Sequence, residues 1–384
     1  MEHLGKLLED SGFANLTWQN LVMFAVGGVL IFLAVKKKYE PLLLIPIGFG
    51  AILANLPQAM MYAVGTGAGT PAAKDGLMQL VYDLGIKTQF LPPVIFLGVG
   101  ALTDFRPLLG RPITFLLGAA AQFGIFIAAL GAFYLFGFSM EEAAAIGIIG
   151  GADGPTSIFL AAILAPHLLG AIAVAAYSYM SLVPIIQPPI MRALTSKKER
   201  AIDMPQTKRV SKTAVVLFPI LLTVLTALAV PACAPLIGML MFGNLLREST
   251  VTDRLYKTAG GPLVNIVTIF LGITVGATMV GPTFITLQTI FILTLGAVAF
   301  SFSTFGGVLF AKALNVILPE GKKINPCIGA AGVSAVPMAA RVVQDFVSRE
   351  TDGRVNPLMA AMGPNVAGVI GSAVAAGVFL ALLR

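Results

Sequence analysis

A single carboxylate stands in an apolar stretch whose backbone carries several glycines and a proline. Asp153 lies in the sequence GIIGGADGPTSIFLA (147–161), and it is the only acidic residue between Ala143 and Lys198. Glycine reaches backbone angles that are closed to other residues, and proline lacks an N–H and disfavours helix at the residue before it. The sequence therefore predicts a helix that is broken at 150–155, with Asp153 at the break.

The predicted break would allow Asp153 to take part in binding a cation. Unwound backbone frees carbonyl oxygens, and carbonyl groups together with a carboxylate are hard oxygen ligands that suit a small alkali cation. An ionised Asp153 can hold such a cation, and a neutral Asp153 holds a proton instead. The alternative is structural, because an Asp before Gly-Pro is also a good cap for a helix that starts near Thr156.

A second segment with glycine and proline, NPCIGAAGVSAVPMAARVVQ (325–344), carries neutral oxygen ligands. Asn325 offers an amide, Ser334 offers a hydroxyl, and Gly329 loosens the backbone between them. Neutral oxygens suit a monovalent cation better than Ca2+, whose sites gather several carboxylates. Arg341 follows Ser334 on the same helix face. It either binds an anionic ligand or is an interfacial arginine whose guanidinium reaches water.

Two further segments place polar groups in apolar surroundings. The run GPN that ends at Asn365 predicts a broken helix over 356–377, where Asn365 offers another amide oxygen. In AAYSYMS (175–181), Tyr177 and Tyr179 are phenols near the middle of an apolar segment. Tyr179 is a candidate for proton transfer, whereas the usual place for tyrosine is the membrane interface.

These segments lie in a strongly apolar chain. Of its 384 residues, 57% are hydrophobic and only 11% are charged, and the mean hydropathy is +0.90. Soluble domains carry about 25% charged residues, so the chain is an integral membrane protein. Apolar runs of helical length recur along the whole sequence. We predict an all-α polytopic membrane protein with about nine to eleven membrane elements, some of them too short to cross.

A basic segment at 192–212 divides the chain into a first membrane half, 1–191, and a second, 213–384. Two sequences of the first half, PPVIFLGVGALTDF and IGGADGPTSIF, resemble GPLVNIVTIFLGITVGATM and IGAAGVSAVPM in the second. This predicts two pseudo-symmetric repeats, inverted as in many secondary transporters, with discontinuous or re-entrant helices that meet at the bilayer midplane. The predicted broken helices are 147–161, 325–341 and 356–377.

Positive charge predicts the orientation of the chain. Cytoplasmic loops carry an excess of Lys and Arg, so the segment 192–212 is predicted to be cytoplasmic. The cluster Lys36–Lys38 then places the N-terminus outside if the first helix crosses. These charges act as topology determinants and lipid contacts, or alternatively as a docking surface for an acidic partner. Nucleic acid is not implied.

The chain has few residues for transition-metal or nucleotide chemistry. Its two cysteines, Cys233 and Cys327, and its two histidines, His3 and His167, argue against a disulfide framework or a zinc site. It has no P-loop, dinucleotide fingerprint, nucleophile elbow or HExxH motif. We therefore expect no bound nucleotide.

At these residues the sequence resembles the β subunits of the biotin-dependent, sodium-translocating decarboxylases, which act on oxaloacetate, methylmalonyl-CoA, glutaconyl-CoA or malonate. The resemblance covers essentially the whole chain, and the run Gly-Gly-Ala-Asp-Gly-Pro-Thr around Asp153 is highly specific. The family's membrane aspartate falls on Asp153, its functional tyrosine on Tyr179 and its final asparagine on Asn365. Its other functional residues fall on Asn325, Gly329, Ser334 and Arg341.

The resemblance implies a reaction and partners. A carboxyltransferase (α) subunit moves a carboxyl group onto biotin of a biotin carrier subunit. The β subunit then decarboxylates carboxybiotin, consumes a proton and exports Na+ across the inner cell membrane. A small membrane anchor subunit (γ or δ type) and a trimer of β subunits are also implied. The implied Na+ ligands are Asp153, Asn325, Gly329, Ser334 and Asn365. The implied groups for proton and carboxylate chemistry are Asp153, Tyr179, Ser334 and Arg341, with Arg341 at the carboxybiotin.

Two other functions fit the same residues. A Na+- or H+-coupled secondary transporter without biotin chemistry needs the same carboxylate, amide and carbonyl oxygens, and it would show Na+ flux without a biotinylated partner. A purely structural membrane anchor would leave the complex fully active after Asp153→Asn.

Overall fold

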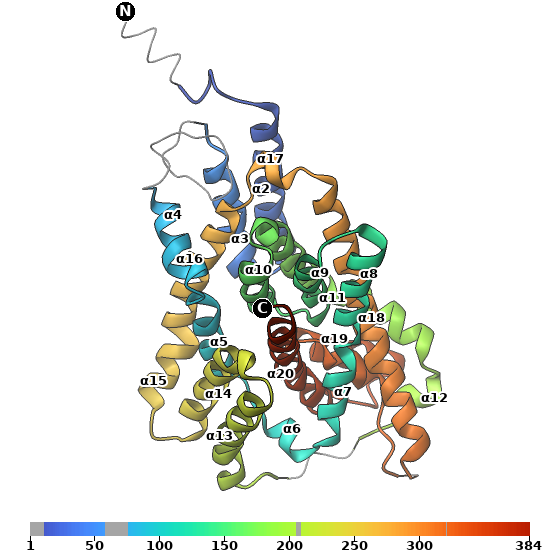
Figure 1. Cartoon of the computed structure of the whole chain (residues 1–384). Helices are drawn as coiled ribbons and strands as arrows, with labels where there is room; N and C mark the ends of the chain where they lie inside the picture. The colour runs from blue at the N-terminus through green and yellow to red at the C-terminus, as the bar shows by residue number, and fades with distance from the viewer. Residues whose placement is uncertain (1–10, 58–75, 205–208, 320) are drawn as a thin grey trace, which may run out of the picture.

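The computed structural model describes residues 11–57, 76–204, 209–319 and 321–384, and every regular element in these ranges is a helix (Figure 1). Seven of these helices are long and apolar enough to cross a membrane. A pair of helices, Leu77–Lys87 and Leu91–Leu102, is bent by 65° and forms either a broken span or a re-entrant loop, and two shorter apolar helices are also present. The prediction of an all-α polytopic membrane protein is confirmed. The first ten residues, whose side of the membrane was predicted, lie outside the described ranges.

The helices follow one another in two series, before and after the basic segment. The first series is α2 (Trp18–Lys37), α3 (Pro41–Ala54), α4 (Leu77–Tyr82), η2 (Asp83–Lys87), α5 (Leu91–Leu102), α6 (Arg106–Gly110), α7 (Ile113–Ala121), α8 (Phe123–Phe136), α9 (Met140–Gly147), η3 (Ile148–Gly151), α10 (Gly154–Leu164), η4 (Pro166–Leu168) and α11 (Leu169–Leu194). The second is α12 (Lys197–Arg200), α13 (Lys212–Ala229), η5 (Pro231–Cys233), α14 (Ala234–Glu248), α15 (Asp253–Thr258), η6 (Ala259–Leu263), α16 (Val264–Ala277), α17 (Gly281–Phe284), α18 (Leu287–Ile317), η7 (Pro326–Gly332), α19 (Met338–Glu350) and α20 (Leu358–Leu383).

Helices α11 and α20 lie in the centre of the molecule, and α18 runs along one side, where it packs against α11, η3 and η7 (Figure 1). The apolar stretches of α11 and α20 are 67% and 61% buried by the rest of the chain, whereas those of α2 and α13 are only 22% and 11% buried. The outer helices therefore present apolar side chains to lipid. The inner helices pack against η3 and η7, and so they position the discontinuous parts of the chain.

Two further pairs of helices cross with their backbones in contact at glycines. Helix α3 packs along α16, and α5 packs along α14 (Figure 1). A Cβ on Gly276 would stand 2.1 Å from the carbonyl oxygen of Ile47, and a Cβ on Gly100 would stand 1.8 Å from that of Leu240. Each pair joins one half of the chain to the other, and a π-helical turn precedes both α5 and α16. This order corresponds to the predicted repeats, whose pseudo-symmetry stays a prediction.

The chain is discontinuous at two places in the centre. Helix α9 passes into the 3-10 helix η3, Ala152 takes a left-handed conformation with φ of 54°, and α10 then begins at Gly154. The second place is η7, also a 3-10 helix, which residues 333–337 separate from α19. Both discontinuities coincide with glycine- and proline-containing sequence.

The predicted break over 356–377 is wrong, because α20 is one continuous helix through Pro364. Pro364 lies in the second turn of this 26-residue helix. A proline there removes a single backbone hydrogen bond, and membrane helices tolerate this loss when neighbouring groups pack around them. Asn365 therefore projects from a regular helix and not from unwound backbone.

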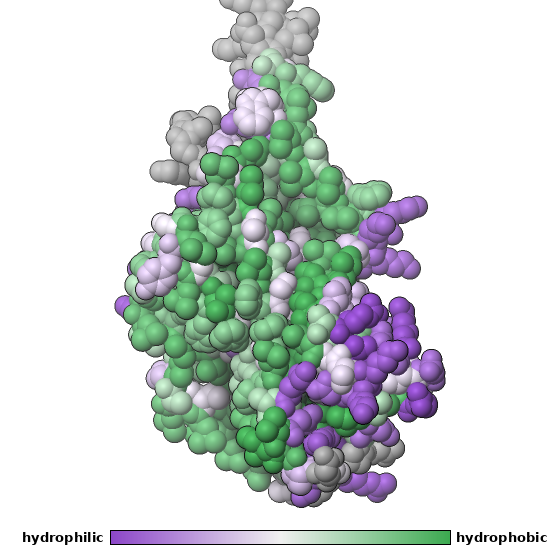
Figure 2. Space-filling view, turned by 90° about the vertical axis from the view of Figure 1, so that its right-hand side faces the viewer, coloured by the Kyte–Doolittle hydropathy of each residue, from purple (hydrophilic) through white to green (hydrophobic). Residues whose placement is uncertain are grey.

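The basic segment at 192–212 is partly helical. Helix α11 extends to Leu194, Ser196 caps the single turn of α12, and Lys212 is the first residue of α13. Figure 2 shows polar residues gathered on the side of the molecule where Figure 1 places α12, beside a mostly apolar surface. The described part of the segment thus contributes a polar surface that is held on helices.

Gly100→Ala is expected to destabilise the protein, because the added methyl group would push α5 away from α14. Overpacking of this kind costs about 1–3 kcal/mol, and the melting temperature in detergent measures it. Gly28→Ala in α2 is the matched control, since no atom lies within 4 Å of the added Cβ. This control should keep or slightly raise the melting temperature. Equal stability of the two variants would contradict a backbone crossing at Gly100.

Candidate functional site

The two discontinuous segments touch each other in the centre of the molecule. The backbone N–H of Ser334, just after η7, donates to the carbonyl oxygen of Gly151, at the end of η3, at 2.8 Å. The hydroxyl of Ser303 on α18 donates to the carbonyl of Gly150 at 2.7 Å. The unwound ends of both segments therefore share a polar contact inside an apolar core.

Asp153 lies at this contact and is 6% exposed. Its Oδ1 accepts a hydrogen bond from the backbone N–H of Thr156 at 3.2 Å, so the residue does cap α10. Its Oδ2 accepts from the hydroxyl of Ser372 on α20 at 2.9 Å, and that hydroxyl lies 2.9 Å from the hydroxyl of Ser334. Capping thus occupies one carboxylate oxygen, and the other faces a chain of two hydroxyls.

Side-chain amides from three parts of the chain hold the carbonyl groups of η7 and of the residue after it. Because η7 is not an α-helix, these carbonyls need other partners. The bonds are Gln187 Nε2 to the oxygen of Ala330 at 2.6 Å, Asn365 Nδ2 to those of Ala331 and Val333 at 3.1 and 2.7 Å, and Gln122 Nε2 to that of Gly332 at 3.5 Å. The segment is therefore held open by donors from Gln122, between α7 and α8, and from α11 and α20.

The oxygen ends of the same three amides remain unused. Among the described residues, Oε1 of Gln122, Oε1 of Gln187 and Oδ1 of Asn365 are buried and have no hydrogen-bond partner. The hydroxyls of Thr156 and Tyr177 share this property. An unpaired buried acceptor costs about 1–3 kcal/mol, and cation coordination offsets such a cost.

Of the predicted cation ligands, Asp153, Ser334 and Asn365 lie together around the contact, and Asn325 does not. Nδ2 of Asn325 donates to the carbonyl oxygens of Arg200 and Ile202 at 2.8 and 3.2 Å. Its Oδ1 accepts from the N–H of Cys327 at 3.1 Å and caps η7. Both ends of this amide are therefore engaged in tying η7 to the chain after α12.

Gly329 is a packing position in η7. A Cβ there would stand 2.0 Å from the carbonyl oxygen of Gly307 on α18, and a Cβ on Gly307 would stand 2.1 Å from the carbonyl oxygen of Gly329. The two backbones are in direct contact, which only glycine at both positions permits.

The two tyrosines of α11 have different surroundings. Tyr177 stands beside the start of α10, where a Cβ on Gly154 would lie 2.1 Å from its ring. Tyr179, the predicted proton-transfer residue, donates its hydroxyl to the carbonyl of Leu293 on α18. Its ring lies against Gly296, which Ile149 of η3 also approaches. The structure thus places Tyr177 at the start of α10, beside Asp153, and Tyr179 against α18 near Ile149 of η3.

Arg341 lies on the exposed face of α19, away from the buried cluster. Asp345 and Arg349 follow on the same face, and the opposite face of the helix is buried. A cleft of about 170 Å³ between α11 and α19 is lined in part by Asp345, Phe346 and Arg349. Arg341 is exposed on this helix but does not line the cleft.

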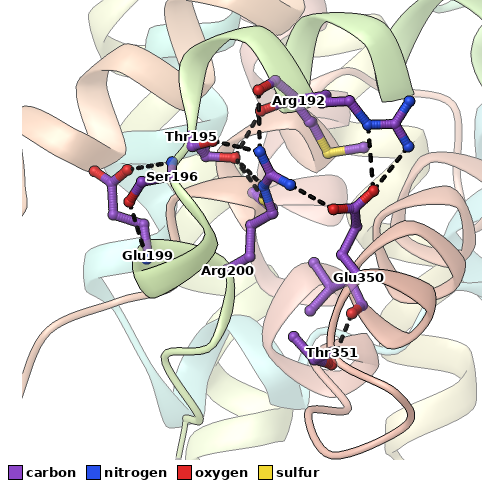
Figure 3. A network of polar contacts seen from close by, with 10 residues as sticks. Arg192, Thr195, Ser196, Glu199, Arg200, Glu350 and Thr351 are labelled. Carbon is purple, nitrogen blue, oxygen red and sulfur yellow. Dashed lines mark hydrogen bonds and ion pairs between the residues drawn. The ribbon is translucent and has the colours of Figure 1, made fainter.

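A network of charged groups joins α11, α12 and α19 near this cleft (Figure 3). Arg192 and Arg200 both pair with Glu350, the former at 2.7 Å, and both guanidinium groups lie 5.6 Å from the ring centre of Phe346. Arg200 also donates to the carbonyl oxygen of Thr195. The hydrogen bond from Arg192, with the nearby charge of Arg200, holds the pKa of Glu350 below its usual value.

Three buried polar residues of this region, Gln122, Gln187 and Ser372, were missed by the sequence analysis. Gln122 is the one amide between Ile113 and Phe138, so the reasoning applied to Asp153 would also have selected it. Ser372 carries no such signal, because serine is common in membrane helices. In the described residues no group of three His, Cys, Asp or Glu side chains is close enough to hold a metal ion. The oxygens of the site are those suited to a monovalent cation.

Known proteins resemble the chain over nearly its whole length. Residues 19–383 match the sequence model of the family described as the Na+-transporting oxaloacetate decarboxylase beta subunit. The glutaconyl-CoA decarboxylase subunit beta of Acidaminococcus fermentans is 57% identical over 99% of this chain and 97% of its own length. The methylmalonyl-CoA decarboxylase subunit beta of Veillonella parvula is 54% identical over 98% and 96%, respectively. The oxaloacetate decarboxylase beta chain of Klebsiella pneumoniae is 49% identical over 99% of both.

Glu350→Gln is expected to lower the melting temperature at neutral pH, because the buried guanidinium of Arg200 loses its anionic partner. Glu350 has a lowered pKa in the folded protein. Its contribution to the free energy of unfolding is therefore fully present above the usual pKa of 4.5 and is lost as the pH falls through the lower pKa of the folded state. Melting curves of both proteins should therefore converge in acid.

Asp352→Asn is the matched control for Glu350→Gln. Its side chain is 90% exposed, and its nearest cation, on Arg354, is 4.0 Å away. Such exposed ion pairs contribute little to protein stability, so this variant should have the melting temperature of the wild type. A Glu350→Gln protein that also melts like the wild type at neutral pH would contradict the role of the network.

Proposed function

The chain belongs to the family of Na+-transporting decarboxylase beta subunits, and we propose that it releases CO2 from carboxybiotin while it moves Na+ through the site at Asp153. It is a multi-pass membrane protein and one subunit of a multi-subunit decarboxylase. The membrane decarboxylase function distinguishes it from a secondary transporter without biotin chemistry, which needs no such partner subunits.

The observation that supports the site most is the chain of hydrogen bonds from Asp153 through Ser372 to Ser334, which links the two discontinuous segments. A buried carboxylate can hold either a cation or a proton. In the ionised state Asp153 accepts from Ser372, and Ser334 then donates to Ser372. The two hydroxyls are thus the first groups to which a proton displaced from Asp153 can pass.

Decarboxylation of carboxybiotin has a defined balance. The bond between the ring nitrogen and the carboxylate carbon breaks, CO2 leaves, and the nitrogen takes up one proton. We propose that entry of Na+ at Asp153 displaces the proton that this step consumes. Reprotonation of Asp153 from the opposite side then releases Na+ outward. Because one proton moves inward for each Na+ that moves outward, this exchange carries no net charge, and the release of CO2 supplies the free energy that moves Na+ against its concentration gradient.

The proposed Na+ ligands are Asp153, Ser334 and Asn365. Together they provide one carboxylate, a hydroxyl and an amide oxygen without a partner, and the single negative charge fits a monovalent ion. Asn325 and Gly329 have a different role in this proposal, because they shape η7: the first caps it and the second lets it approach α18. Their substitution would displace the ligands indirectly.

Carboxybiotin is proposed to arrive at the surface formed by α11, α12 and α19. Arg341 on the exposed face of α19 would pair with the carboxylate of the incoming group. Tyr179, whose ring shares Gly296 with η3, is proposed as a further proton-transfer group. The excess of Lys and Arg in 192–212 supports a cytoplasmic position for this surface, and the cluster Lys36–Lys38 supports an N-terminus outside. A biotin carrier, a carboxyltransferase, a small membrane anchor and a trimer of this chain complete the proposed complex.

Asp153→Asn is expected to abolish the stimulation of decarboxylation by Na+. The amide side chain cannot exchange a cation for a proton, so the coupling is lost while the fold is kept. The measurement is the decarboxylation of free carboxybiotin by the purified membrane complex with and without Na+.

Asp253→Asn is the matched control for this experiment. Asp253 is exposed on α15 and pairs only with Lys257 one turn away, so the variant should respond to Na+ like the wild type. An unchanged Na+ response of Asp153→Asn would contradict the assignment of the Na+ site to Asp153. Na+ flux through the chain in the absence of any biotinylated partner would instead favour the secondary transporter.

A further inference from the structure

Gln122 occupies the junction of four segments, and its orientation is determined by its neighbours. It lies between α7 and α8 and is 5% exposed. Its Nε2 donates to the carbonyl oxygen of Gly118 at 2.9 Å and lies 3.5 Å from those of Gly332 and Gly368. Three acceptors around one end of the amide require that this end be the NH2 group. The oxygen must therefore point to the opposite side.

The oxygen of Gln122 points toward the site of Asp153. The position of a Cβ on Gly151 lies 3.4 Å from Oε1 of Gln122 and 2.9 Å from Cβ of Ser372. Ser372 is the residue whose hydroxyl donates to Asp153. Oε1 of Gln122 has no hydrogen-bond partner among the described residues. Because residue 151 has no side chain, this oxygen and Ser372 flank the same position, which Cδ1 of Ile125 also approaches to 3.2 Å.

We propose that Oε1 of Gln122 is a ligand of the transported Na+ and that Ser372 positions the carboxylate of Asp153 for it. This inference rests on the proposed function, in which Asp153 holds the ion. A neutral amide oxygen coordinates a metal cation but adds nothing to a proton that is covalently bound to a carboxylate. Gln122 therefore favours Na+ over H+ at a carboxylate that by itself accepts both. The residue determines specificity and takes no part in breaking the bond to CO2.

The experiment compares Gln122→Met with the wild type in the purified complex. Methionine fills the same space without an oxygen, so the Na+ concentration for half-maximal stimulation of carboxybiotin decarboxylation should rise about 10-fold, the usual loss when a group that supports a metal site is removed. The maximal rate at saturating Na+ should be retained. A second readout is binding itself: the rise in melting temperature that Na+ produces should shift to correspondingly higher Na+ concentrations.

Ser303→Ala is the matched control, because Ser303 also holds a discontinuous segment through one buried hydrogen bond, to Gly150, but leaves no oxygen free. It should lower the melting temperature and keep the wild-type dependence on Na+. If Gln122→Met behaves like Ser303→Ala in both readouts, the inference is overturned, because the amide then serves structure alone. Gln122→Asn, which withdraws the oxygen by one methylene, provides the same comparison if the methionine variant does not fold. An unchanged Na+ dependence of Gln122→Asn also overturns the inference.

Asp153→Asn in the same assays separates the two proposals. If it abolishes the response to Na+ and Gln122→Met does not alter it, the site at Asp153 stands and only the role of Gln122 falls. If Asp153→Asn itself responds normally to Na+, the proposed function falls together with the inference.

Discussion

Backbone carbonyl groups that leave a helix inside an apolar protein need other hydrogen-bond donors, and the centre of this molecule is arranged around that requirement. Each unsatisfied group would cost several kcal/mol. In η7 and just after it, the amides of Gln122, Gln187 and Asn365 provide these donors from different parts of the chain. At the end of η3, Ser303 and the backbone of Ser334 do the same. The broken geometry therefore exists only in the assembled helix bundle.

The same arrangement creates the chemistry of the site. An amide that donates through its nitrogen also carries an acceptor oxygen, and three such oxygens remain buried without partners among the described residues. The oxygen of Gln122 and Ser372, whose hydroxyl reaches Asp153, both lie near Gly151. The side chains that stabilise the break therefore also surround the carboxylate with neutral oxygens. A monovalent cation suits this environment, because only one full negative charge is present.

Hydrogen bonds and an ion pair connect the polar surface to the central break. Asn325 binds the carbonyl groups of Arg200 and Ile202 and at the same time caps η7. Arg200 in turn pairs with Glu350 at the end of α19 (Figure 3). Hydrogen bonds and ion pairs thus connect both ends of the segment that carries Ser334 to the polar surface of α12 and α19.

The sequence by itself determined the membrane class, the helical fold and the break at Asp153, because hydropathy, glycine and proline act locally. The family followed from the resemblance of its motifs. It was wrong about 356–377, since packing around α20 outweighs the local effect of one proline. Only the tertiary structure decided which polar groups meet. Ser372 reaches Asp153 across 219 residues of sequence, and Asn325 turns instead to the chain near α12. Such pairings depend on how helices cross, and no local pattern of residues encodes that geometry.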